Sequence, residues 1–385
     1  MAVPKSQLTV LSLISSEGYF GAENMLLTLA SSLRDLGCSS IVGVLCDSRF
    51  NHVELAEEAR RHNLEVEVIP CAGRFDWRVV NRIRALKDRH QADLVHTHGY
   101  KADFYARVAT WGEAFPLVAT CHNWPSKAWI MRAYAALDRL VLRGFDGITV
   151  ISDSIGDLLR QSGVRCDKLR KIPNGIDTRR FRTAEPILGK EIASSGEALV
   201  GFVGRCVSDK GGAILLHAAE QVLRQFPLTR FVFVGDGPVR VEWESLAERL
   251  GIRDRVVFTG VRNDMPEVYA SLTLFVLPSL CEAMPMSVLE AMAAARPVVA
   301  TRVGSVTKLV VEGETGLLVE AGDVDGLAAA IVEMLRDPGQ AGRMGLNARV
   351  HAESHFSARA MARGYLDLYR EVLQKSERLR EYAVV

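Results

Sequence analysis

The sequence predicts an α/β protein built from two doubly wound domains, and three observations support this prediction. The chain has 385 residues, which is more than one hydrophobic core usually organises. Short runs rich in Val, Ile and Leu alternate with amphipathic helical segments almost throughout, a pattern typical of parallel sheets covered by helices on both faces. The alternation stops once, over 178–197, and then restarts. We therefore expect two Rossmann-like domains that face each other across a cleft, with a ligand at the carboxyl ends of their strands.

Each short apolar run is interpreted as a buried strand. The strands predicted for the first domain are 8–14, 40–46, 64–70, 93–99, 116–122, 147–153 and 169–174. Those predicted for the second domain are 199–204, 230–237, 256–260, 274–279, 297–304 and 315–323. The resulting division is a first domain over 1–180, a linker over 181–197, a second domain over 198–356 and a C-terminal helix over 357–385. That last helix could return to pack on the first domain.

The composition is that of a globular protein without a strong charge. Hydrophobic residues make up 48% and charged residues 24%, and the formal net charge of +1 gives no reason to expect a nucleic-acid partner. The seven cysteines lack paired C-x-x-C spacing, and Cys38, Cys46, Cys71 and Cys121 lie in or beside apolar segments. We therefore expect reduced, mostly buried thiols and a cytoplasmic protein. No apolar run reaches the ~18 residues of a membrane span, so any membrane contact would be peripheral.

One segment is compatible with such a contact. Residues 125–143 can form a helix with Trp129 and Leu137 along one face and three arginines in a stripe beside it. This arrangement suits an anionic lipid surface, and hence peripheral attachment to the inner face of the cell membrane. It suits equally well a helix that packs on the core and leaves a basic flank in solvent.

The most informative stretch is 278–299, in which Glu282 and Glu290 are separated by seven residues. The apolar run 274–277 predicts a buried strand, and the segment from about Met286 predicts a helix. The loop then places one carboxylate at the end of the strand, and the helix holds the second about one turn in. Free backbone amides at the start of a helix suit a phosphate. The layout therefore fits a ligand with a polyol, a phosphate and a ribose, such as a nucleotide sugar.

Two cations are expected at the same edge of the second sheet. Residues 201–212 follow a strand and open a helix, and they contain Arg205 and Lys210 beside several glycines. An arginine fork and a lysine charge can neutralise a diphosphate without a metal. Gly235 belongs to a second turn at this edge, where a tight turn and a direct ligand contact are equally good interpretations.

The first domain offers weaker signals. Gly18 and Gly21 lie between its first strand and helix, where backbone amides can approach a phosphate. His122 ends a strand at the expected cleft, although a single histidine often has only a structural role. His96 and His98 could share one face of a strand, but no third metal ligand of suitable spacing follows them.

A further acidic pair, Asp323 and Asp325, lies at the head of a predicted helix, where helix capping explains it better than a metal does. We therefore expect no metal and no other cofactor.

Taken together, these residues resemble the retaining nucleotide-sugar glycosyltransferases of family 4, which have the GT-B fold. The resemblance runs from roughly Gly18 to Glu353, and it depends on the E-x7-E pair, GFVGR…DKG, EAMAAARPVVAT, NGIDTRRF and GDGP. It implies a UDP- or GDP-sugar donor and a hydroxyl acceptor that is a carbohydrate or is lipid-linked. Synthesis of a cell-envelope polysaccharide or glycolipid is the implied setting.

The resemblance also implies roles for individual residues. Arg205 and Lys210 would bind the donor diphosphate, and Glu290 would bind the ribose. Glu282 would contact the transferred sugar, with His122 near the reacting centre. The other donor contacts that the resemblance implies are Gly21, Gly204, Gly235, Val261, Arg262, Ala283, Met284, Pro285, Met286 and Ser287.

The chain departs from the family pattern at three places. Phe20 precedes Gly21 where two glycines are usual, and Ala295 replaces a glycine. Residues 304–308 read Gly-Ser-Val-Thr-Lys where the family usually has Gly-Gly-x-x-Glu, in a loop near the donor.

No carboxylate nucleophile is evident, which disfavours double displacement. The resemblance suggests front-face attack, with the leaving phosphate taking the proton of the acceptor. Two alternatives are a nucleotide-sugar epimerase of the same fold and a non-catalytic nucleotide-sugar-binding subunit.

Overall fold

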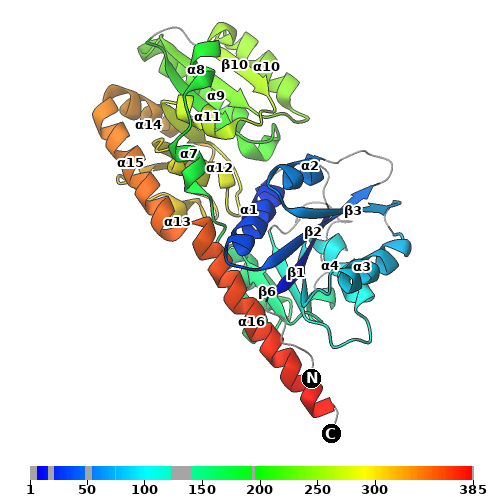
Figure 1. Cartoon of the computed structure of the whole chain (residues 1–385). Coiled ribbons are helices and arrows are strands. Elements are labelled where there is room, and N and C mark those ends of the chain that lie inside the picture. The colour runs from blue at the N-terminus through cyan, green and yellow to red at the C-terminus, as the bar shows by residue number, and fades with distance from the viewer. Residues whose placement is uncertain are drawn as a thin grey trace. The chain divides into compact units, whose positions relative to one another are not determined.

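The computed structural model describes residues 7–15, 21–47, 54–73, 75–122, 140–192 and 196–383. Their contacts divide the chain into two compact units. The first unit consists of Met1–Gly175 together with Ala358–Val385, and the second consists of Ile176–Ser357. Each unit contains one parallel sheet covered by helices (Figure 1).

The first unit contains a seven-stranded sheet in the order β3-β2-β1-β4-β5-β6-β7. All neighbouring strands are parallel, and most of their residues are buried. The strands are β1 (Thr9–Ser15), β2 (Ser39–Asp47), β3 (Glu65–Cys71), β4 (Leu94–His98), β5 (Leu117–Cys121), β6 (Gly147–Val150) and β7 (Leu169–Lys171). The order reverses between β1 and β4, so a crevice is expected at the carboxyl ends of these two strands.

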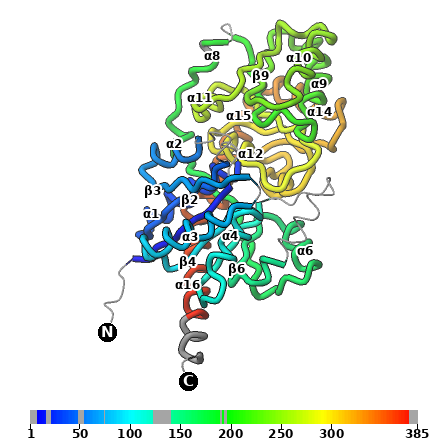
Figure 2. Tube along the Cα trace, turned by 90° about the vertical axis from the view of Figure 1, so that its right-hand side faces the viewer, coloured from blue at the N-terminus to red at the C-terminus, as the bar shows by residue number. Residues whose placement is uncertain are grey.

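The helices of the first unit include the last helix of the chain. They are α1 (Gly21–Asp35), α2 (Glu54–Arg61), α3 (Arg78–Arg89), α4 (Tyr100–Ala109), α6 (Asp153–Gln161) and α16 (Ala358–Ala383). α16 contacts α1 and β6. α16 lies beside α1 (Figures 1 and 2), and its residues Met361, Tyr365 and Tyr369 belong to the same apolar cluster as Met25 and Leu29 of α1. The end of the chain thus completes the core of the first unit.

The second unit contains a six-stranded parallel sheet in the order β10-β9-β8-β11-β12-β13. Its strands are β8 (Ala198–Val203), β9 (Thr229–Val234), β10 (Val256–Gly260), β11 (Leu274–Leu277), β12 (Val298–Thr301) and β13 (Gly316–Val319). Its helices are α7 (Thr178–Arg182), α8 (Ile187–Ile192), α9 (Gly212–Gln225), α10 (Arg240–Arg249), α11 (Met265–Ser271), α12 (Met286–Ala293), α13 (Val306–Leu309), α14 (Val324–Arg336) and α15 (Pro338–His355). α9 and α14 lie side by side over a core that includes Phe202, Phe231 and Trp243 (Figure 2).

Every strand that the sequence predicts is present, but several end earlier than predicted, because the polar residues after them begin other structures. β6 ends at Val150, and Ser152 caps α6 by accepting a hydrogen bond from the amide of Ile155 at 3.4 Å. β11 ends at Leu277, because Pro278 has no N–H to continue the ladder. The two doubly wound sheets that the apolar pattern predicts are confirmed.

The stretch 178–197, which shows no sustained apolar period and contains the linker predicted over 181–197, includes α7 and α8. Both helices pack on α11, and α7 also contacts α12. The apolar period is too short to be recognised here, because α7 has five residues and α8 has six. The surface helix predicted at 125–143 lies almost entirely outside the described residues.

Within the described part of the chain, no helix is both long enough and apolar enough to span a membrane. All seven cysteines are free, and Cys38, Cys46, Cys71 and Cys121 are buried as predicted.

Candidate active site

The site in the second unit forms where the strand order reverses. β8 and β11 are neighbours in the sheet, and the strands that follow each of them along the chain lie on opposite sides of this pair. At such a point the loops after the two strands leave a crevice at their carboxyl ends, where ligands bind in this class of sheet. The loop after β8 carries Arg205 and Lys210, and the loop after β11 carries Glu282.

Lys210 and Glu282 are in direct contact, although 72 positions separate them in the sequence. The Lys210 ammonium donates to Glu282 Oε1 at 2.6 Å, and the Ser279 hydroxyl donates to the same oxygen at 2.7 Å. The Glu282 side chain is 8% exposed and that of Lys210 is 26% exposed. The Glu282 carboxylate is buried, so breaking its ion pair with the partly exposed Lys210 would be costly, and the pair is held in place for this reason.

Two glycines allow these loops to approach so closely. Gly211 has φ +71°, and a Cβ added to it would lie 1.9 Å from the carbonyl oxygen of Pro278. Gly304 has φ +50°, and its added Cβ would lie 1.7 Å from the carbonyl oxygen of Glu282. Gly211 allows the loop after β8 to contact the loop after β11. Gly304 allows the loop after β12 to contact the backbone of Glu282. Both positions exclude any side chain.

α12 begins at Met286, as the sequence predicts, with Pro285 as its N-cap residue. Pro285 makes no side-chain hydrogen bond to the first turn, and the first amides of an α-helix have no intrahelical acceptor. The positive end of the helix dipole lies at the same place. Ala283, which precedes this turn, accepts a hydrogen bond from the Ser305 amide at 3.2 Å. The loop 282–285 is thus fixed by its neighbour, and the helix start is suited to an anion.

Glu290 lies in the second turn of α12 and is 7% exposed. The Tyr269 hydroxyl of α11 donates to Glu290 Oε2 at 2.9 Å. Burial and the adjacent carboxylate both raise the pKa of Tyr269 well above its usual value, so the hydroxyl stays protonated and remains a donor. Phe181 of α7 packs edge-on against the Tyr269 ring, with centroids 6.0 Å apart. The NGIDTRRF segment therefore supports the helix that contacts Glu290.

The remaining donor residues that the sequence predicts occupy loops at the same edge of the sheet. The amide of Gly204 donates to Val234 at 3.0 Å and that of Gly235 to Gly260 at 2.8 Å, so both amides serve to hold the turns together. Arg262 forms ion pairs with Asp264 and Glu191 at 2.5 and 2.9 Å, which joins α8 to the start of α11. Val261, beside it, is 74% exposed.

In the first unit, Gly21 is the first residue of α1 and His122 follows the end of β5. His122 Nε2 lies 2.9 Å from His98 Nδ1, at the end of the neighbouring strand β4. Burial lowers the pKa of His122 to about 4 and that of His98 well below its usual value. Both rings are therefore neutral at neutral pH. Gly18 lies outside the described residues.

Two residue patterns that raised the question of a metal serve the fold instead. His96 bonds to Thr120 and Tyr369 at 2.7 Å each. Asp323 caps α14 by accepting from the amide of Gly326 at 2.9 Å, as predicted. Within the described ranges, no group of three or more His, Cys, Asp or Glu side chains is arranged to bind a metal ion.

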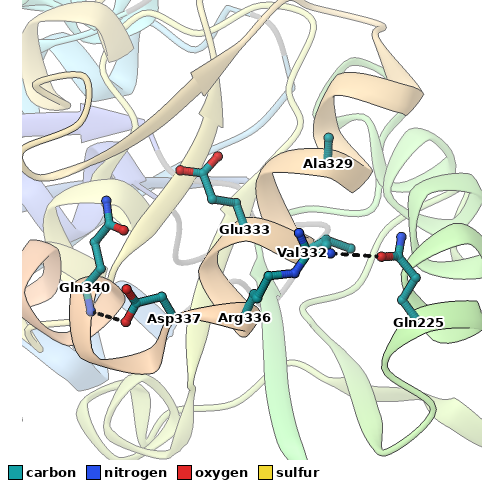
Figure 3. A pocket seen from close by; sticks show the side chains of 7 residues that line it. All are labelled: Gln225, Ala329, Val332, Glu333, Arg336, Asp337 and Gln340. Carbon is teal, nitrogen blue, oxygen red and sulfur yellow. Dashed lines mark hydrogen bonds between the residues drawn. The ribbon is translucent and has the colours of Figure 1, made fainter.

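The second unit also has an open hollow far along the chain from these loops. It is lined by Gln225, Ala329, Val332, Glu333, Arg336, Asp337 and Gln340 (Figure 3). The Arg336 guanidinium donates to Gln225 across it at 3.3 Å, and Asp337 caps α15. These contacts engage Arg336 and Asp337, and the site is assigned instead to the β8 and β11 loops, which bring Lys210 and Glu282 together beside the start of α12.

Sequence reasoning missed the residues that support the two glutamates. Ser279 and Tyr269 bond to them directly, and Gly304 fixes the backbone of Glu282. The contact of Ser279 with Glu282 could have been predicted from the local sequence, because Ser279 is a hydroxyl residue at a strand end, three positions before the glutamate. Tyr269 had none, because its partner lies 21 residues away on another helix.

Comparison with known proteins identifies the class. The family described as "Glycosyltransferase Family 4" matches residues 20–180, and the one described as "Glycosyl transferases group 1" matches residues 197–337. The D-inositol 3-phosphate glycosyltransferase of Acidothermus cellulolyticus is 31% identical over 325 residues, which cover 76% of this chain and 70% of that protein. The lipopolysaccharide core biosynthesis mannosyltransferase LpcC of Rhizobium leguminosarum is 31% identical over 251 residues, covering 63% of this chain and 69% of that protein.

Among solved structures, Anabaena Alr3699/HepE in complex with UDP-glucose matches with a TM-score of 0.81 at 23% identity. The match covers 96% of this chain and 99% of that one, and it establishes the shared fold. The chain therefore belongs to glycosyltransferase family 4, a family of retaining nucleotide-sugar glycosyltransferases with the GT-B fold. The family expectation drawn from the E-x7-E pair and its neighbours is confirmed.

Proposed function

We propose that this glycosyltransferase moves a sugar from a UDP- or GDP-sugar to a hydroxyl group of a carbohydrate or lipid-linked acceptor, without a metal. The observation that carries the proposal is the Lys210–Glu282 pair at the point where the strand order of the second sheet reverses. It places a cation and a carboxylate beside the uncapped start of α12. A diphosphate requires the cation and the helix start, and sugar hydroxyls suit the carboxylate.

In this proposal Lys210 and Arg205 neutralise the diphosphate together with the amides from Ala283 to Ser287. A lysine ammonium has three N–H groups, so Lys210 can donate to Glu282 and to phosphate oxygens at once. Glu282 orients the transferred sugar, Glu290 binds the ribose, and the backbone at Val261 and Arg262 meets the base. His122 acts near the reacting centre.

The chemical step then needs little from the protein beyond charge stabilisation. The bond from the anomeric carbon to the diphosphate oxygen breaks, and a bond from that carbon to the acceptor oxygen forms on the same face. The acceptor proton passes to the departing phosphate oxygen. Arg205, Lys210 and the dipole of α12 stabilise the negative charge as it develops on the leaving group.

The names of similar proteins guide the choice of substrates. One structural neighbour is described in complex with UDP-glucose, which favours a UDP-sugar as the first donor to test. LpcC is named for lipopolysaccharide core synthesis, which supports an acceptor of the cell envelope. An acceptor held in a membrane would bring the enzyme to the inner face of the membrane, and residues 125–143 are the segment to test with anionic liposomes.

A donor panel tests the proposal. The correct nucleotide sugar should raise the melting temperature, and turnover should require an acceptor. Lys210→Ala should reduce kcat by about 100-fold or more, the range for one charge-stabilising donor, whereas Arg249→Ala, at an exposed arginine of α10, should change it little. Full activity of Lys210→Ala would exclude the proposed diphosphate site. A new sugar isomer formed from donor alone would instead indicate an epimerase.

A further inference from the structure

His98 and His122 form a closely packed pair at the carboxyl ends of β4 and β5. Besides the 2.9 Å contact between their nitrogens, the rings are stacked, with centroids 5.2 Å apart and an interplanar angle of 24°. His98 is 3% exposed. Its other nitrogen, Nε2, is buried and has no hydrogen-bond partner among the residues that the structure describes.

Burying the Nε2 atom of His98 without a partner costs free energy, which a residue with only a packing role would avoid. A buried polar atom without a partner loses its hydration and gains nothing in return, so an apolar ring would be the better choice for packing alone. The hydrogen bond that His98 does make leads to His122. Its presence is therefore best explained by what it does to His122.

The His98 ring is also supported by a second, fully bonded ring. The His96 ring lies 4.2 Å from that of His98 between centroids. Thr120 and Tyr369 each bond to one nitrogen of His96. Tyr369 is fully buried and comes from α16. The C-terminal helix therefore anchors His96, His96 packs against His98, and His98 bonds to His122.

Because both rings are neutral, the hydrogen bond between His98 and His122 has a defined donor and a defined acceptor. Because burial lowers the pKa of both rings, each carries one proton at neutral pH. One nitrogen of the 2.9 Å contact must then be the donor and the other the acceptor. It follows that the protonation state of His98 Nδ1 determines which nitrogen of His122 carries its proton.

We propose that His98 is a positioning residue that fixes the orientation and the tautomer of His122, and that Tyr369 of the C-terminal helix holds this arrangement through His96. The proposal deepens the proposed function, because it rests on His122 acting near the reacting centre. It adds the end of the chain to the parts of the enzyme on which the chemistry depends.

Two substitutions of His98 separate positioning from packing. His98→Phe keeps an aromatic ring but removes the bond to His122, and it also removes the unpartnered nitrogen. We expect an equal or higher melting temperature and a kcat reduced about tenfold, the value of one lost hydrogen bond. His98→Asn places a polar atom near the position of Nδ1 and should keep kcat within about threefold of the wild-type value.

Two tyrosines on α16 allow a second comparison, in which each substitution removes one buried hydroxyl. Tyr369→Phe removes the hydroxyl that bonds to His96 directly, whereas Tyr365→Phe removes one that bonds to Thr120 and Thr149 and reaches His96 only through Thr120. Both side chains are fully buried. We expect the first substitution to lower kcat more than the second, with the donor KM unchanged in both.

The decisive readout is the side-chain ¹⁵N NMR spectrum of His122 in ¹⁵N-histidine-labelled enzyme. We expect one tautomer in the wild type and in His98→Asn, and a mixture in His98→Phe. Unchanged kcat and an unchanged His122 spectrum in folded His98→Phe would refute the proposal. Full activity of His122→Ala would refute the role of His122 itself, and the spectra would still test whether His98 sets its tautomer.

Discussion

Acid should destabilise the first unit because it contains three neutral histidines, of which His96 and His98 are buried and His122 is half-buried. Burial lowers the pKa of His96 to about 3 and that of His122 to about 4, and it lowers the pKa of His98 well below its usual value. In the unfolded chain each returns to about 6.5. Below about pH 6.5 the three histidines therefore bind protons in the unfolded chain but remain neutral in the folded unit. The stability that the neutral histidines contribute is fully present above that pH, and it is lost as the pH falls toward their pKa values in the folded unit.

The size of the effect at about pH 5 depends little on the folded pKa values, provided that they lie below that pH. The relevant interval is then about 1.5 units, which corresponds to about 2 kcal/mol per histidine and about 6 kcal/mol for three. Typical domains have a total stability of only about 5–15 kcal/mol. The first unit should therefore be close to unfolding at about pH 5 while it is stable at about pH 7.5.

Urea unfolding monitored by tryptophan fluorescence measures this difference. Four of the five tryptophans fall within residues 1–175, and Trp243→Phe silences the one in the second unit. His98→Asn should reduce the difference in unfolding free energy between about pH 7.5 and about pH 5 by about 2 kcal/mol, because it removes one titrating ring. His217→Asn, at an exposed position of the second unit, should leave it unchanged. Equal pH dependence in wild type and His98→Asn would refute the reasoning.

Three further predictions concern the second unit. Tyr269→Phe removes the bond to Glu290 but keeps the ring contacts, so the KM for donor should rise about fivefold to tenfold with little change in kcat; an unchanged KM would separate Glu290 from donor binding. Gly304→Ala forces a Cβ against the Glu282 carbonyl and should abolish most activity, whereas Gly313→Ala, also at positive φ but with nothing within 4 Å, should cost only about 1 kcal/mol of stability; equal activity in the two would contradict the proposed support of Glu282. Exhaustive treatment with EDTA should leave turnover intact, and activity restored only by a divalent cation would overturn metal-free transfer.

The fold was predictable because it depends on local, repeated signals. Each buried strand of a parallel sheet is an uninterrupted apolar run, and the polar residues that end it also begin the next element. The run that forms β11 is visible without any knowledge of the neighbouring strands, because all four of its residues are apolar and buried: Leu274, Phe275, Val276 and Leu277. α7 and α8 were not predicted, because helices of five and six residues are too short to show the helical repeat of apolar residues.

The site was predictable only in part, for a related reason. Lys210 and Glu282 stand in loops directly after strands, and Glu290 stands in the helix that follows the second of these loops, so their placement at this edge of the sheet follows from the strand and helix pattern. The contact between Lys210 and Glu282 follows from strand order, which the sequence did not provide. The bond from Tyr269 to Glu290 depends on how α11 packs against α12, and no spacing in the sequence encodes it.

The two glutamates of the E-x7-E pair consequently differ in what holds them. Glu282 is fixed by charge, through Lys210, and by backbone contact with Gly304, so its support comes from loops at the edge of the sheet. Glu290 is fixed by a neutral hydroxyl on a packed helix, which α7 supports in turn. A carboxylate paired with a lysine responds to an arriving phosphate, because the three N–H groups of the ammonium then bond to both anions and one cation is shared between them. A carboxylate bonded to a buried tyrosine does not. Donor binding should therefore reorganise the surroundings of Glu282 and leave Glu290 in place, as expected if Glu282 contacts the transferred sugar and Glu290 the ribose as proposed.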